Sequence, residues 1–127
     1  MHLVLVTLMT IGVLPLSSPI SKQVETQMST VSWYGGRVFE GREMASGQTF
    51  GNHYPSYTVA HKSLPMGTTV IFYNPDNGLW IIATVRDRGP YIDGRQFDLV
   101  DSGARALDFI DAGVASLEAT WYVAPPN

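Results

Sequence analysis

The four-residue segment Pro-Asp-Asn-Gly, at positions 75–78, lies between two β-prone segments and constrains the fold more than any other feature of the chain. The flanking segments are Thr-Thr-Val-Ile-Phe-Tyr-Asn at 68–74 and Leu-Trp-Ile-Ile-Ala-Thr-Val-Arg-Asp at 79–87. Asn and Gly supply the backbone conformations that a tight connection between antiparallel strands requires. We therefore predict a β-hairpin in the middle of the chain.

Other short β-prone segments are separated by turn residues, and the chain contains 12 Gly and 8 Pro in 127 residues, which favours short strands over long helices. We predict the remaining strands at 31–34, 57–61, 96–100 and 114–123. A single short helix is expected at 104–107, with Asp101 and Ser102 as its N-cap. Six strands and one helix in about 93 residues predict one mainly β domain, a compact barrel.

The second hairpin strand places one carboxyl group at its end. Four alternate residues share one face and are apolar: Leu79, Ile81, Ala83 and Val85. Asp87 continues this face, so we expect it where the buried face reaches the surface at the mouth of the barrel. An Asp before Arg-Gly-Pro can serve chemistry, or it can be a structural group that accepts backbone N–H bonds and pairs with Arg88.

The N-terminal segment 3–16 is apolar and uncharged, and it is too short to span a bilayer comfortably. Its length is typical of a secretory signal, which predicts a signal peptide at 1–18, a linker at 19–30, a domain at 31–123 and a tail at 124–127. An apolar N-terminal strand or a misassigned start is the alternative. We expect a secreted, periplasmic or cell-envelope protein, and the absence of cysteine excludes a lipoprotein anchor.

Several functions are excluded by what the chain lacks. No run of Lys or Arg resembles the basic surface of a nucleic-acid-binding protein. No Gly-rich phosphate loop precedes a helix, so neither a nucleotide nor another cofactor is indicated. His53 and His61 have no third ligand at a suitable spacing, so we expect no metal site. We expect a monomer.

A series of motifs resembles the rare lipoprotein A family, whose relatives include expansins and barwin-like proteins. The motifs, in order, are Val31–Gly35, Gly41-Arg42, Ala45–Gly47, Ala60–Thr68, the turn at 74–78, Asp87–Pro90, Gly94-Arg95, Phe97–Leu99 and the Ala-rich segment at 104–107. The resemblance covers nearly the whole predicted domain. It implies a six-stranded double-psi β-barrel.

The resemblance also implies a lytic transglycosylase that binds the glycan strands of bacterial peptidoglycan. Such enzymes cleave the bond between N-acetylmuramic acid and N-acetylglucosamine without water and leave a 1,6-anhydro end. Asp87 matches the catalytic Asp of the family, and His61 matches its groove histidine. Gln48 occupies a position where family members commonly have Glu, and Gln can bind a sugar hydroxyl but cannot titrate. We expect four further substrate-binding residues: Tyr34, Arg88, Tyr91 and Asp98.

Several of these residues also have a purely structural interpretation. A lone histidine is more often a structural hydrogen-bonding group than a catalyst, and Asp98 can bond turn amides near the helix start. Trp33 is expected in the core rather than on a sugar-binding surface. Glu40 and Glu43 could replace the missing carboxylate, although solvated loop charges are the simpler interpretation.

Two functions therefore remain after the sequence analysis. The first is the exported transglycosylase with Asp87 as acid and base. The second is a non-catalytic, expansin-like module that binds wall glycans in the same groove, which the loss of a carboxyl group at Gln48 favours. A secreted inhibitor, as among barwin-like relatives, is disfavoured because those relatives usually carry disulfides and this chain has no cysteine.

Overall fold

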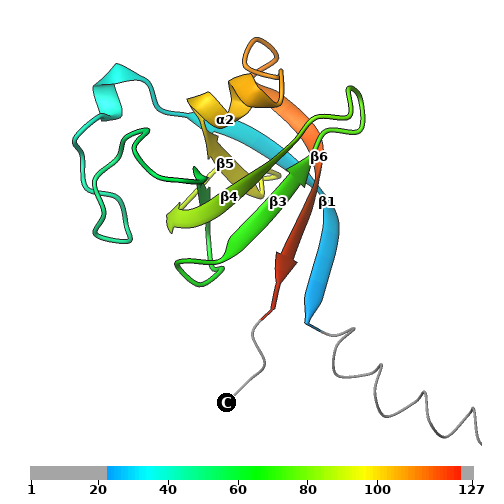
Figure 1. Ribbon diagram of the computed structural model, residues 1–127, viewed down its shortest axis with the longest axis horizontal. Helices are drawn as coiled ribbons and strands as arrows, with labels where there is room; N and C mark the ends of the chain where they lie inside the picture. Colours follow the sequence, from blue (N-terminus) through cyan, green and yellow to red (C-terminus); the bar gives the residue numbers. More distant parts are fainter. Residues whose placement is uncertain (1–22, 124–127) are drawn as a thin grey trace, which may run out of the picture.

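The computed structural model describes residues 23–123, which form a closed barrel of six strands with one short α-helix (Figure 1). The signal peptide expected at 1–18 and the tail expected at 124–127 lie outside the described residues. None of the helices in the described part of the chain is long and apolar enough to cross a bilayer. The predicted six-stranded barrel with one short helix is confirmed.

The strands follow the order β1-β5-β2-β4-β3-β6 around the barrel, so neighbours in space are often distant in sequence. The elements are β1 (Val24–Tyr34), the 3-10 helix η1 (Arg37–Phe39), β2 (Tyr57–His61), β3 (Thr69–Tyr73), β4 (Trp80–Asp87), β5 (Phe97–Val100), α2 (Asp101–Ala106) and β6 (Val114–Tyr122). The pairs β1–β5 and β2–β4 are parallel, and β3–β4 is the predicted antiparallel hairpin.

Apolar side chains from all six strands fill the interior. For β4, the alternation of buried and exposed residues follows the predicted pattern. Within β4, Ile81, Ala83 and Val85 are buried, whereas Trp80 and Ile82 are exposed. Fully buried residues from the other strands include Val31, Val59, Val70, Phe72, Phe97, Leu99 and Leu117. Trp33 packs against this core, and its indole Nε1 donates a 2.9 Å hydrogen bond to the carbonyl of Ile110, which agrees with the expected core position.

The first strand is longer than predicted, and this corrects the domain boundary. The segment 24–30, expected to be linker, pairs along its whole length with β6, from Val24 opposite Tyr122 to Thr30 opposite Ser116. Its polar side chains are compatible with a strand because this part of β1 is mostly exposed on both faces. Composition alone therefore failed to identify it, since the pattern typical of a half-buried strand is absent.

The helix begins earlier than predicted and without the expected cap. Asp101 is its first residue, the N-cap position is Val100, and no side chain caps the N-terminus. Ser102 instead donates a 3.1 Å hydrogen bond to Asn52 Oδ1. The helix turns directly back onto β5, which requires Gly103: a Cβ atom there would lie 2.8 Å from Leu99 Cγ.

Candidate functional site

A bulge between β2 and β4 aligns two aspartates across one alanine. Val59 pairs with Val85, but the next residue, Ala60, pairs with Asp87, so Arg86 is the extra residue of β4. On its other side Ala60 pairs with Asp98 of β5. The two aspartates are therefore two strands apart, or roughly 10 Å between Cα atoms.

This bulge changes the expected orientation of Asp87. Val59 and its partner Leu99 belong to the core, whereas the adjacent pair, Ala60 and Asp98, lies on the other face of the sheet. Asp87 joins this outer row instead of continuing the inward face of β4. The prediction that Asp87 ends β4 is confirmed, but the carboxyl reaches the surface through the bulge and not through the inward alternation.

Three hydrogen-bond donors hold the carboxylate of Asp87. Its Oδ1 accepts 2.9 Å bonds from the backbone N–H groups of Ala45 and Arg88. Its Oδ2 accepts a 3.0 Å bond from the hydroxyl of Tyr34, which comes from β1. The carboxyl is thus fixed in position by groups from three separate segments, and it remains only half-buried.

Tyr34 reaches Asp87 from an apolar cluster on the outer side of the barrel. Its ring lies 5.8 Å from the ring of Phe39 and 5.5 Å from that of Phe50. Burial, followed by the charge of Asp87, raises the pKa of the Tyr34 phenol well above its usual range. The phenol therefore keeps its proton and acts on Asp87 through its hydroxyl, while its ring packs against Phe39 and Phe50. A substrate-binding role for Tyr34 stays a prediction.

Asp98 lies in the same row and is partly buried. Its Oδ1 accepts a 3.1 Å hydrogen bond from the hydroxyl of Ser32 on β1. Burial raises the pKa of the Asp98 carboxyl, Ser32 and Arg95 oppose this, and the charge of Asp87 adds to it. Asp98 and Asp87 thus flank Ala60 in one row, and a substrate-binding role for Asp98 stays a prediction.

We expect Asp98→Asn to increase the free energy of unfolding at neutral pH. Because the pKa of Asp98 is raised on folding, the folded state binds this proton more tightly than the unfolded state. This contribution to stability is complete below the ordinary Asp pKa of about 3.9 and is lost as pH rises through the folded pKa. Urea unfolding from about pH 3 to pH 7 should show that the free energy of unfolding of the variant, relative to that of wild type, increases as pH rises. If the free energies of unfolding of the two proteins changed in parallel with pH, the raised pKa of Asp98 would be contradicted.

The loop that carries Gln48 is folded against β4. Its turn is closed by backbone bonds from Met44 N–H to the Gln48 carbonyl and from Gly47 N–H to the Met44 carbonyl, both 2.8 Å. Ser46 N–H donates to the Arg86 carbonyl at 3.0 Å. Gln48 is exposed at the base of this turn, close in sequence to the amide that binds Asp87. Glu40 and Glu43 are also exposed, which favours solvated loop charges.

One ring nitrogen of His61 is engaged in local hydrogen bonds. Nδ1 accepts hydrogen bonds from the backbone N–H groups of Ser63 and Leu64, at 3.1 and 3.0 Å. The ring also packs 4.8 Å from that of Phe97. Burial, followed by the charges of Arg88 and Lys62, lowers the pKa of His61. The neutral ring therefore carries its proton on Nε2, and a catalytic role for His61 stays a prediction.

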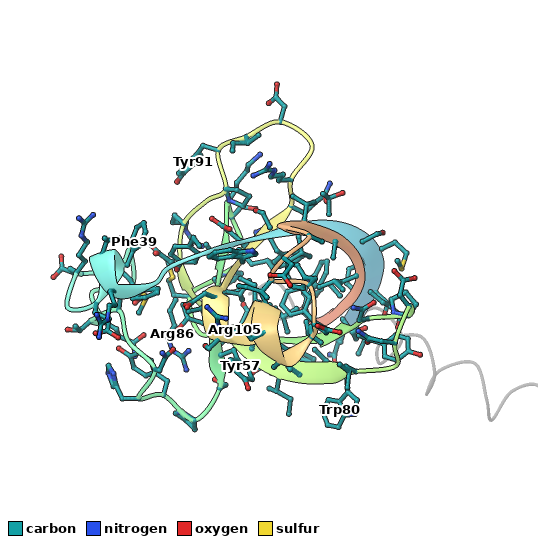
Figure 2. All side chains as sticks on the ribbon, turned by 90° about the horizontal axis from the view of Figure 1, so that it is seen from above. Phe39, Tyr57, Trp80, Arg86, Tyr91 and Arg105 are labelled. Carbon is teal, nitrogen blue, oxygen red and sulfur yellow. The ribbon has the colours of Figure 1, made fainter. Side chains whose placement is uncertain are left out.

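Arg88 and Tyr91 differ in their surroundings. Arg88 Nη1 donates to the carbonyls of His61 and Leu64, at 3.2 and 2.7 Å, so its guanidinium supports the turn after β2. Tyr91 is 79% exposed, as a surface role requires, and Figure 2 shows it on a loop that projects from the barrel. Arg86 and Tyr57 lie toward the opposite side of that view.

Two features of the site could not be predicted from the sequence. Ser32 was only part of a motif, and its contact with Asp98 follows from the parallel register of β1 and β5. The amide of Ala45 depends on how the loop 42–50 folds back. In the part of the chain that the structure describes, no three His, Asp or Glu side chains form a group able to hold a metal ion.

Comparison with known proteins identifies similar sequences over most of the barrel. A family model described as "Lytic transglycolase" matches residues 26–119. The "Probable endolytic peptidoglycan transglycosylase RlpA" of Treponema pallidum is 43% identical over 94 residues, which are 74% of this chain and 28% of that protein. The protein of the same name from Aquifex aeolicus is 47% identical over 88 residues, or 69% of this chain and 38% of that protein. The chain thus spans about a third of these relatives' length.

Among solved structures, an expansin of Clavibacter michiganensis superposes with a TM-score of 0.60 at 20% identity, covering 81% of this chain and 52% of the expansin. A mutant of that expansin in complex with cellohexaose superposes with a TM-score of 0.57 at 17% identity, with the same coverage. At this identity the likeness concerns the fold, and it confirms the predicted expansin-like barrel.

Proposed function

Because the chain belongs to the lytic transglycolase family, whose model matches residues 26–119, we propose that it is an exported peptidoglycan lytic transglycosylase with Asp87 as its acid and base. The predicted resemblance to the rare lipoprotein A family is confirmed by this match and by the two transglycosylase relatives. The names of those relatives supply the substrate, the glycan strand of peptidoglycan. The cell envelope is the compartment in which that substrate occurs.

The proposed reaction uses one carboxyl group twice. Protonated Asp87 gives its proton to the glycosidic oxygen as the bond from that oxygen to the anomeric carbon of muramic acid breaks. The resulting carboxylate then accepts the proton of the muramyl 6-hydroxyl while the 6-oxygen bonds to the anomeric carbon. The products are a 1,6-anhydromuramyl end and a new 4-hydroxyl end, and Asp87 regains its proton. No water is consumed, so a second carboxylate to activate water is not required.

The observation that carries the proposal is the way Asp87 is held. Two backbone N–H groups fix Oδ1, while Oδ2 faces a hydroxyl that can either donate or accept a hydrogen bond. Tyr34 can therefore stabilise both protonation states of Asp87 without moving its ring. Such a partner suits a group that first gives and then takes a proton.

The test is digestion of purified sacculi by the full chain, with the soluble products examined by mass spectrometry. We expect muropeptides with 1,6-anhydro ends. Products with ordinary reducing ends would indicate hydrolysis, and no product would contradict catalysis. Because the matched segment is a minor part of the relatives, the assay should use intact sacculi and isolated glycan strands in parallel.

We expect Tyr34→Phe to reduce kcat by about tenfold and to leave KM nearly unchanged, the pattern for loss of one hydrogen bond that positions a reacting group. The substitution retains the ring that packs against Phe39 and Phe50, so the fold should be maintained. Steady-state rates on glycan strands give the two constants. A matched control is Tyr73→Phe, which removes an exposed hydroxyl on β3. A rise in KM alone would instead show that Tyr34 binds substrate.

The second candidate is a non-catalytic module that binds wall glycans in the same groove. Two observations favour it: Gln48 cannot titrate, and an expansin of the same fold is known in complex with cellohexaose. Pull-down on insoluble peptidoglycan, run beside the product assay, distinguishes the two. Binding without anhydro products would select this candidate.

A further inference from the structure

Arg86, the extra residue of the β4 bulge, is a buried cation whose partners are all uncharged. Its side chain is only 6% exposed. Nη1 donates to the Ser56 carbonyl at 3.0 Å and to Thr58 Oγ1 at 2.9 Å, and Nη2 donates to Ser56 Oγ at 2.9 Å. The guanidinium carbon lies 4.2 Å from the centre of the Tyr54 ring. In the described part of the chain, no Asp or Glu pairs with it.

Such a group is costly unless something compensates its charge. Buried charges in proteins are normally paired with an opposite charge, because transfer from water into the interior is unfavourable. Burial lowers the pKa of the Arg86 guanidinium, as expected for a cation without a facing carboxylate. Neutral hydrogen bonds and the Tyr54 ring compensate only part of this cost.

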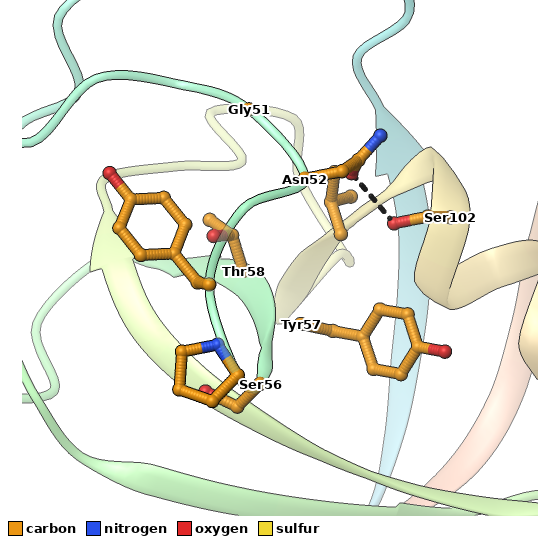
Figure 3. A pocket seen from close by; sticks show the side chains of 9 residues that line it. Gly51, Asn52, Ser56, Tyr57, Thr58 and Ser102 are labelled. Atoms are coloured by element: carbon orange, nitrogen blue, oxygen red, sulfur yellow. Dashed lines mark hydrogen bonds between the residues drawn. The ribbon is translucent and has the colours of Figure 1, made fainter.

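A cavity of about 290 Å³ lies beside these same partners (Figure 3). Ser56, Thr58 and Tyr54, which contact Arg86, are among the nine residues that line it. None of the nine carries a charge. Because a water molecule occupies about 30 Å³ in the liquid, the space is large enough for a small organic group.

The cavity also presents hydrogen-bond donors. Thr58 Oγ1 accepts from Arg86, so its own hydrogen remains available for another acceptor. Asn52 uses its Oδ1 to accept from Ser102, the bond drawn in Figure 3, so the two N–H donors of its amide are available for other partners. The cavity therefore has hydrogen-bond donors, a cation without an acidic partner near them, and no acidic residue in its lining. This combination favours the binding of an anion.

We propose that this cavity is a carboxylate-binding subsite, in which Thr58 and Asn52 donate to the carboxylate and Arg86 supplies the compensating charge. The donor set and the volume fit a small carboxylate. If the proposed function holds, such a group comes either from the lactyl ether of muramic acid or from the end of a stem peptide. The subsite lies under the loop that joins η1 to β2, and it does not include Asp87, so binding there is separable from cleavage.

The test is an NMR titration of the full chain with sodium acetate against sodium chloride at equal ionic strength. We expect acetate alone to shift the backbone amides of Gly51, Asn52, Thr58 and Ser102 in a saturable way. Asn52→Asp keeps the oxygen that accepts from Ser102 and adds a negative charge to the cavity, so it should weaken acetate binding by at least about tenfold. Gln27→Glu makes the same charge change on the exposed part of β1 and should leave binding unchanged.

Two results would overturn the proposal: no saturable acetate shift in the folded protein, or equal acetate affinity in wild type and Asn52→Asp. The source of the carboxylate is separated by displacing acetate with N-acetylmuramic acid, with N-acetylglucosamine, which lacks the lactyl group, and with D-alanyl-D-alanine. Displacement by the first or the third supports the subsite and names its ligand; displacement by N-acetylglucosamine as readily as by N-acetylmuramic acid contradicts it. None of these readouts requires cleavage, so failure of the proposed function does not decide the result.

Discussion

Asp87→Asn is expected to lower the release of anhydro-muropeptides by about 10²–10⁴-fold, the usual contribution of a general acid–base group. The amide has the shape of the carboxyl but neither gives nor takes a proton at neutral pH. Its oxygen can still accept from the N–H groups of Ala45 and Arg88, so the loop 42–50 should stay in place. The rate of product release from sacculi, measured by mass spectrometry, gives the effect.

Two measurements make this result specific. Asp76→Asn makes the same charge change in the exposed hairpin turn, where only the backbone N–H of Asp76 is engaged, and it should retain full activity. Pull-down on insoluble peptidoglycan should show that Asp87→Asn still binds. If the variant released products at the wild-type rate, Asp87 would lose its role while the family assignment would stand.

The alternation of apolar residues explains why so much of the fold could be predicted. Ile81, Ala83 and Val85 follow the period of a strand, and the turn at 75–78 determines the direction of its neighbour. The order of strands around the barrel was not available from such local patterns, because β1 lies between β5 and β6, far away in sequence. The resemblance to a known family supplied the closed six-stranded barrel, and the structure supplies the order of its strands.

The candidate site was predictable in its residues but not in their contacts. Asp87 and Asp98 were both identified, yet their alignment across Ala60 depends on a bulge that no sequence pattern marked. The contact of Tyr34 with Asp87 joins residues 53 positions apart. Because of the bulge, Arg86 is the extra residue of β4, and its guanidinium donates to Ser56 and Thr58. Local patterns determine which face a residue occupies, and tertiary packing determines its partners.

Phe97→Ala is expected to reduce the free energy of unfolding by about 3–5 kcal/mol, a large part of the roughly 5–15 kcal/mol typical of a domain. Phe97 is 1% exposed, and its ring contacts three others, at 4.8 Å from His61, 5.1 Å from Phe72 and 5.9 Å from Trp121. These rings come from three other strands, so the cavity left by the substitution cannot be filled by moving one element. Urea unfolding, with comparison of midpoint and slope, measures the loss.

The same substitution links the core to the site, because Phe97 precedes Asp98 on a strand of only four residues between β1 and β2. If the variant stays folded under assay conditions, the row that contains Asp98, Ala60 and Asp87 should lose its alignment, and kcat should fall together with stability. Tyr91→Ala removes an aromatic ring that is 79% exposed, so it should change the free energy of unfolding by no more than about 0.5 kcal/mol. A loss below about 1 kcal/mol for Phe97→Ala would show that the interior repacks, and the site would then not depend on this ring.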